Sequence, residues 1–100
     1  MNLEVQLDIN NQHGVFFIEM EEEIIATMSF RLTDEKEIIV DHTVVDREHE
    51  NKGYAKALMK EMINYVQANK LRLVPLCAFV KDQLKYYPHV SYFTLDLEDE

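Results

Sequence analysis

The chain has 100 residues, of which 47% are hydrophobic and 29% are charged, proportions typical of a folded globular domain rather than a disordered segment. We therefore expect residues 1–100 to form a single domain. The net charge of −9 argues against nucleic acid as a main partner, because the field of the chain would oppose the phosphate backbone. The single cysteine, Cys77, excludes an internal disulfide, and the apolar runs are too short to span a bilayer. We expect a cytoplasmic protein without a membrane partner.

The first 45 residues predict four strands joined by short turns. Residues 3–9 alternate between apolar and polar side chains, which is the period of a strand with one buried face. Residues 15–20 and 24–32 are rich in aromatic and β-branched side chains, and the acidic turn 21–23 separates them. Residues 37–45 complete an antiparallel meander.

The pattern changes period after residue 50. Residues 51–69 carry apolar side chains at three- and four-residue spacing, which predicts a helix of about four to five turns. A short strand at 71–77 and a short helix at 80–87 follow, with a possible final strand at 90–97. Because a long helix separates the fourth and fifth strands, these two should run parallel. The predicted class is α+β, with a mixed, mostly antiparallel sheet in the order β-β-β-β-α-β-α.

The junction between the fourth strand and the long helix carries the most informative motif, which spans residues 44–58. A helix start offers unpaired backbone N–H groups and a partial positive charge, so it is suited to binding phosphate. Gly53 and Ala55 keep the first turn free of bulk. Lys52 and Lys56, spaced i and i+4, suit a phosphate group, although solvated helix lysines are an equally good interpretation.

This junction resembles the acetyl-coenzyme A motif of the Gcn5-related N-acetyltransferase (GNAT) family, in which Arg/Gln-x-x-Gly-x-Gly/Ala follows a strand. Gly53 and Ala55 match the motif, whereas Glu50 stands where the family has Arg or Gln. The sequence Pro75-Leu76-Cys77-x-Phe79-Val80, together with His42-Thr43, resembles a subgroup of very small members. The resemblance covers residues 13–90 and implies a reduced acyl-CoA N-acyltransferase fold.

The resemblance implies acetyl-CoA as cosubstrate and an amine of a small molecule or peptide as acceptor, and we expect no metal. Larger relatives enclose the acceptor with additional elements, so here the acceptor site should be open or completed by a second chain in a homodimer. The diphosphate should lie on the backbone amides of residues 51–56 and the pantetheine along residues 43–45. The implied cofactor-binding residues are Thr43, Val44, Val45, Asn51, Lys52, Gly53, Tyr54, Ala55 and Lys56.

Three side chains are candidates for proton transfer or covalent catalysis. Strand alternation places His42 in an apolar row, either as a satisfied core residue or as the proton acceptor from the amine, and places Asp41 on the opposite face as a structural residue. Cys77 is either a small buried hydrophobe or a functional thiol that protonates the departing thiolate or carries the acetyl group. Tyr86, or its neighbour Tyr87, either packs in the core or protonates the thiolate, as a tyrosine does in many larger relatives.

Alternative functions are also open. A binding module that holds coenzyme A or a protein without turnover is favoured by Glu50, and a pure interaction protein is a third class. A zinc site made from His13, His49, His89 and Cys77 lacks ligand spacing, and a cysteine hydrolase lacks a nucleophile signature.

Charge is distributed unevenly along the chain. Residues 46–85 hold eight basic and five acidic side chains, a net charge of +3, whereas residues 1–45 carry −8. The segment with the expected phosphate site is therefore locally basic. The acidic remainder could steer a cationic amine toward the site.

Overall fold

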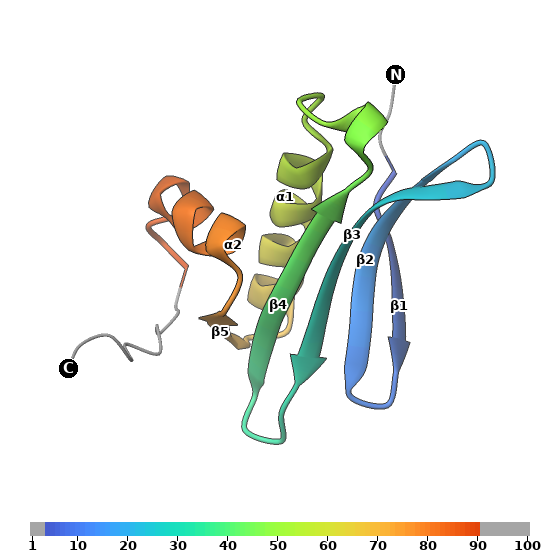
Figure 1. Ribbon diagram of the computed structural model, residues 1–100. Coiled ribbons are helices and arrows are strands. Elements are labelled where there is room, and N and C mark those ends of the chain that lie inside the picture. Colours follow the sequence, from blue (N-terminus) through green and yellow to red (C-terminus); the bar gives the residue numbers. More distant parts are fainter. Residues whose placement is uncertain (1–3, 91–100) are drawn as a thin grey trace.

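The computed structural model describes residues 4–90, which form one sheet with helices after its fourth and fifth strands (Figure 1). The elements in chain order are β1 (Gln6–Asn10), β2 (His13–Met20), β3 (Glu23–Leu32), β4 (Glu37–Val45), the 3-10 helix η1 (Arg47–His49), α1 (Tyr54–Ala68), β5 (Arg72–Pro75), α2 (Ala78–Gln83) and the 3-10 helix η2 (Leu84–Tyr86).

The strand order in the sheet follows the order in the chain, β1-β2-β3-β4-β5. The first four strands pair antiparallel, and β4 pairs parallel with β5 because α1 makes the crossover between them. The predicted class and element order are therefore confirmed.

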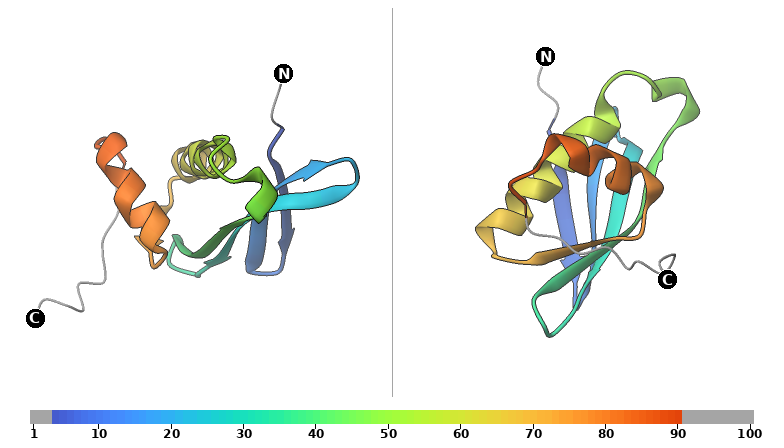
Figure 2. Two further views of the ribbon diagram at one scale, coloured as in Figure 1. Left: turned by 45° about the horizontal axis from the view of Figure 1, so that its top comes forward. Right: turned by 90° about the vertical axis from the view of Figure 1, so that its left-hand side faces the viewer.

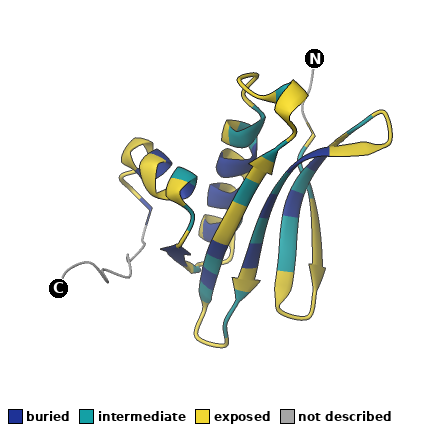
Figure 3. Cartoon of the chain, viewed as in Figure 1, coloured by how far each residue is buried: buried dark blue, intermediate teal, exposed yellow. Residues whose placement is uncertain are grey.

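Helix α1 lies across one face of the sheet (Figure 2), and its buried residues lie on the side toward the strands (Figure 3). Its apolar stripe is buried against inward-facing side chains of β2, β3 and β4. The fully buried members include Leu58, Met59 and Met62 from the helix, and Phe16, Met28, Ile38 and Val40 from the strands. This packing fixes where the N-terminus of α1 lies relative to the end of β4.

A β-bulge interrupts β4 in the middle of the strand. Ser29 pairs with His42 but Phe30 pairs with Val40, so Asp41 is an extra residue without a cross-strand partner in this register. Ile38 and Val40 face the core before the bulge, whereas Thr43 and Val45 take the inward positions after it. The prediction that His42 continues the apolar row is therefore wrong, because one inserted residue reverses the alternation.

Several boundaries differ from the prediction for local reasons. Helix α1 begins at Tyr54 rather than at residue 51, because Asn51 (φ 64°) and Gly53 (φ 87°) both adopt left-handed backbone conformations. Strand β5 and α2 are shorter than expected, and η2 replaces the last turn of the predicted 80–87 helix. The predicted strand at 90–97 lies outside the described residues, except for Val90.

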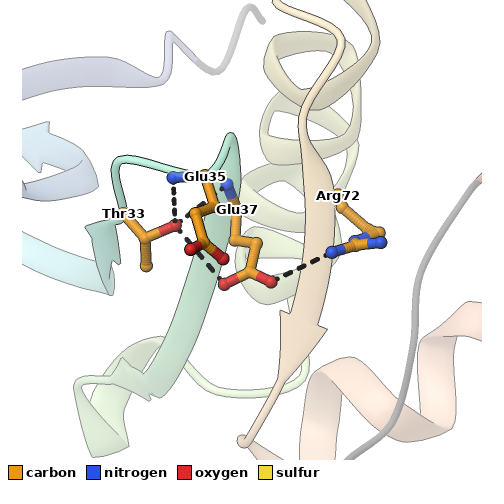
Figure 4. A network of polar contacts seen from close by, with 4 residues as sticks. All are labelled: Thr33, Glu35, Glu37 and Arg72. Carbon is orange, nitrogen blue, oxygen red and sulfur yellow. Dashed lines mark hydrogen bonds and ion pairs between the residues drawn. The ribbon is translucent and has the colours of Figure 1, made fainter.

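A polar network closes one end of the β4–β5 pair (Figure 4). The hydroxyl of Thr33 accepts hydrogen bonds from the backbone N–H groups of Glu35 and Glu37, both at 3.2 Å, and donates to Glu37 Oε1 at 3.3 Å. Arg72 on β5 then donates to Glu37 Oε2 at 3.1 Å, and its backbone N–H donates to the carbonyl of Lys36 at 2.8 Å. We call these contacts the Thr33–Glu37–Arg72 clamp. It ties the β3–β4 turn to the first residue of β5.

Candidate acetyl-coenzyme A site

A cavity of about 550 Å³ opens at the other end of β4, where the strand leads through η1 into α1. Its wall comes from the last residues of β4, the loop that follows, the first turn of α1, and one side chain of α2. The lining residues are Thr43, Val45, His49, Glu50, Asn51, Gly53, Tyr54, Ala55, Lys56 and Phe79.

The start of α1 leaves its first backbone N–H groups available to a ligand. The N-cap residue is Gly53, which makes no side-chain capping bond, and the first amide with a helical partner is Ala57, which donates to Gly53 at 3.0 Å. A Cβ at Gly53 would meet nothing within 4 Å, so its missing side chain leaves open space beside the helix start. These features suit an anion approaching the main chain.

Most residues predicted to bind the cofactor line this cavity. Val44 and Lys52 do not line it. The prediction that residues 43–45 all lie along the pantetheine is therefore wrong for Val44. Val44 is 57% exposed because it alternates with Thr43 and Val45 and lies on the other face of the sheet. Lys56 and Glu50 contribute opposite formal charges to the lining, so the wall is not uniformly cationic.

Cys77 lies next to the cavity without lining it. Its thiol Sγ donates a hydrogen bond to Thr43 Oγ1 at 3.4 Å, and Thr43 is a lining residue. Cys77 is half-buried, carries a free thiol, and is the N-cap residue of α2. The contact connects β4 to α2 beyond the last paired residues of β4 and β5.

His42 lies on the face of β4 opposite to Thr43, and its side chain is 76% exposed. The bulge brings the side chain of Asp41 beside it, with Asp41 Oδ1 at 3.6 Å from His42 Nδ1. Asp41 Oδ1 also accepts a hydrogen bond from Ser29 Oγ at 2.9 Å. The sequence prediction that Asp41 and His42 point to opposite faces is wrong, because the bulge lets these adjacent side chains lie together.

Tyr86 lies apart from the cavity. It is 63% exposed, and Lys85 Nζ lies 5.4 Å from the centroid of its ring. Tyr87 is half-buried against the core. Thus none of the three predicted catalytic side chains, His42, Cys77 or Tyr86, lines the cavity.

Three lining residues were not among the predicted site residues. Phe79 belongs to the Pro75–Val80 motif, so that motif could have indicated Phe79 as a site residue. Glu50 stood out in the sequence only as a departure from the family motif. His49 reaches the cavity because η1 turns the chain between β4 and α1, and strand or helix periodicity gives no signal for such a turn.

Residues 4–90 hold no feature typical of a metal site or of a membrane span. This part of the chain holds no group of three or more His, Cys, Asp or Glu side chains placed to ligate a metal ion. Its helices are also too short and too polar to cross a lipid bilayer.

A mixed sheet with a bulged β4, a parallel β5 and a cavity at the start of the crossover helix defines the acyl-CoA N-acyltransferase class of fold. The family model described as GCN5-related N-acetyl-transferase matches residues 15–93. The chain therefore belongs to the GCN5-related N-acetyltransferase family. No curated protein matches the sequence significantly.

Solved structures share this fold. A GCN5-like candidate N-acetyltransferase from Staphylococcus aureus, solved by NMR, has a TM-score of 0.68 and 28% identity, over 99% of this chain and 96% of its own. The ribosomal-protein-alanine N-acetyltransferase of Brucella melitensis biovar Abortus 2308 has a TM-score of 0.61 and 21% identity, over 82% of this chain and 63% of its own.

A candidate streptothricin acetyltransferase from Bacillus anthracis was solved in complex with acetyl coenzyme A. It has a TM-score of 0.53 and 11% identity, and the match covers 62% of this chain and 35% of the Bacillus chain. The present chain thus spans less than two thirds of the Brucella and Bacillus proteins. Their likeness establishes the shared fold.

Proposed function

We propose that residues 1–100 act as one acetyl-CoA-dependent N-acetyltransferase domain, which transfers an acetyl group to an amine of a small molecule or peptide. The observation that carries the proposal is the cavity at the uncapped start of α1, in a chain that belongs to a family of acetyltransferases. The proposed setting is the cytoplasm.

The lining fits the two chemically different parts of coenzyme A. The free amides of residues 54–56 and the Lys56 ammonium suit the diphosphate, because both offer hydrogen-bond donors and positive potential. Thr43 and Val45 present an inward-facing strip of β4 to the pantetheine arm. The open space at Gly53 lets a phosphate approach the backbone.

Acetyl-CoA supplies an activated thioester, and the chain must then move two protons. We assign proton acceptance from the attacking amine to His42, which lies on β4 two residues beyond Val40, the last residue of this strand that pairs with β5. Cys77 or Tyr86 returns a proton to the departing coenzyme A thiolate. In the covalent alternative, the Cys77 thiolate attacks the thioester carbonyl, the bond to the coenzyme A sulfur breaks and coenzyme A thiolate leaves, and the amine then displaces the acetyl group from Cys77. Cys77 has the better position of the two, because its thiol contacts the lining residue Thr43.

Cofactor binding is tested by isothermal titration and by thermal melting with acetyl-CoA and with coenzyme A. We expect micromolar to low-millimolar dissociation constants and a melting temperature that rises with ligand concentration. An absence of heat and of any melting shift with both ligands would overturn the proposal.

The route of transfer is tested by intact mass after exposure to acetyl-CoA. An adduct of one acetyl group that disappears in Cys77→Ala would establish a covalent intermediate, whereas turnover without an adduct would establish direct transfer. Cys77→Ser is the matched control, because it keeps a hydroxyl donor toward Thr43 while removing the thiol.

A coenzyme A-binding module without turnover is the second candidate. It is favoured by the Glu50 carboxylate in the lining and by the position of all three catalytic candidates outside it. Binding of acetyl-CoA without acetyl transfer to polyamines, amino acids or peptides would support this candidate over the enzyme.

We propose a cationic amine as the acceptor, because residues 1–45 carry a net charge of −8. The value of kcat/KM for a polyamine should then fall as salt is added, and a flat salt dependence would contradict the assignment. A second chain that completes the acceptor site would appear as a dimer in light scattering.

A further inference from the structure

His49 has an unusual environment in the wall of the cavity. It is the last residue of η1, it is half-buried, and its ring centroid lies 6.0 Å from that of Tyr54 with a 50° tilt between the planes. Both residues line the cavity. The backbone N–H of His49 donates to the carbonyl of Asp46 at 2.8 Å, so the main chain at this position is fixed by its own hydrogen bond.

The Nδ1 atom of His49 is shielded from solvent and has no hydrogen-bond partner among residues 4–90. No other side-chain nitrogen or oxygen in this part of the chain is left in that state. Buried polar atoms are paired in the large majority of cases, because an unpaired one loses its water without replacement. A phenyl ring would fill the same space without that cost, so the imidazole is poorly explained by packing alone.

The surroundings indicate what could pair with it. His49 lies between the end of β4 at Val45 and the start of α1 at Tyr54, and it lines the same cavity as Glu50, Asn51 and the first turn of α1. The torsion about its Cβ–Cγ bond has a broad range, so the ring can rotate to turn Nδ1 toward a molecule in the cavity. A neutral imidazole offers one N–H donor, which suits an acceptor oxygen.

We propose that His49 is a cofactor-binding residue, whose imidazole donates a hydrogen bond to a phosphate oxygen of coenzyme A in this cavity. The inference rests on the proposed function and adds a ligand contact from η1 to those from β4 and α1. It explains why an unpaired polar atom is kept in the wall of a site. The unpaired nitrogen destabilises the free protein slightly and is satisfied when the ligand binds.

The test compares coenzyme A affinity, measured by titration, with the melting temperature of the free protein in three variants. His49→Phe should bind coenzyme A about tenfold more weakly, while the free variant melts at or above the wild-type temperature. His49→Asn should bind within about threefold of wild type, because its amide nitrogen occupies a position close to that of Nδ1. His13→Phe, at an exposed position of β2, should change neither quantity.

The outcomes separate this inference from the proposed function. Wild-type affinity in His49→Phe would overturn the role of His49 and leave the enzyme proposal standing. A free His49→Phe protein that melts well below wild type, with His49→Asn weakened equally in binding, would show a structural role and overturn the inference. If the wild-type protein binds no coenzyme A, both proposals fail. Should His49→Phe not fold, the comparison of His49→Asn with His49→Leu decides in the same way.

Discussion

The two ends of the β4–β5 pair are built in different ways. At one end the strands are paired from Glu37 with Arg72 to Val40 with Pro75, and the Thr33–Glu37–Arg72 clamp closes the turn beside them. At the other end, Leu76 donates its backbone N–H to Val40 at 3.0 Å, and the register then ends. Beyond that point, β4 bulges and lines the cavity.

This difference separates stability from binding along one pair of strands. The paired end is held by backbone hydrogen bonds and buried apolar side chains, which have little tolerance for change. At the open end, the Cys77 thiol donates a hydrogen bond to Thr43, which joins β4 to the start of α2. Few intramolecular contacts therefore close the end of the strand pair at which a ligand would bind. Changes at the two ends should affect different measurements.

The largest effect is expected from Ile38→Ala at the paired end. Ile38 is 0% exposed, and its side chain belongs to the core between the sheet and α1. Truncation leaves a cavity there and should reduce the free energy of unfolding. We expect a loss of about 2–5 kcal/mol in urea denaturation. Ile38→Val, which should lose about 0.5–1.5 kcal/mol, is the graded control. Equal stability of Ile38→Ala and wild type would show that this end is not the anchor.

Gly53→Val should have the largest effect at the open end. Gly53 has a φ of 87°, which a β-branched residue adopts only with strain, and its missing side chain borders open space. We expect coenzyme A affinity to fall about a hundredfold, or about 2.7 kcal/mol, in calorimetric titration. Gly53→Asn is the matched control, because asparagine tolerates the left-handed region. Unchanged affinity in Gly53→Val would place the ligand elsewhere.

Glu37→Ala removes the centre of the clamp and should destabilise the fold modestly. The side chain of Arg72 is 53% exposed, so solvent weakens this ion pair, and we expect a loss of about 1 kcal/mol in unfolding free energy. Coenzyme A affinity should not change, because the clamp lies at the end of β4 opposite to the cavity. A loss of affinity would show that the two ends are coupled.

Glu50→Gln should have the smallest effect, and it should be a gain. Removing a carboxylate from the cavity wall reduces repulsion of a phosphate, so coenzyme A should bind about two- to fivefold more tightly at low salt. Glu48→Gln removes the same charge from a position in η1 outside the lining and should change affinity less. The difference between the two variants should shrink at high salt. Tighter binding in both to the same degree would indicate only a change in net charge.

The sequence was sufficient to predict the order of the elements, because period and turn chemistry are local properties. Residues 37–45 are predicted as one strand, and β4 has those bounds. The bulge at Asp41 could not be predicted in this way, since it depends on how β3 and β4 pair. That one inserted residue determines on which face of the sheet the side chains of His42, Thr43 and Val44 lie.

The candidate site was predictable to the extent that it lies on a contiguous motif. Gly53, Ala55 and Lys56 are close in sequence and share the first turn of α1, so their position in the cavity wall follows from the helix start. Phe79 and His49 reach the same wall from α2 and η1. Their convergence depends on tertiary packing, which periodicity does not encode.

The strand order of the sheet has a consequence for the folding pathway. Neighbouring strands from β1 to β4 are joined by short turns, so these three pairings close small loops and should form quickly. Only the pairing of β4 with β5 must wait for a connection that contains all of α1. The cavity draws its wall from both sides of this late connection. In a stopped-flow refolding experiment, recovery of coenzyme A binding should therefore follow the recovery of sheet structure, and its rate should report the docking of α1.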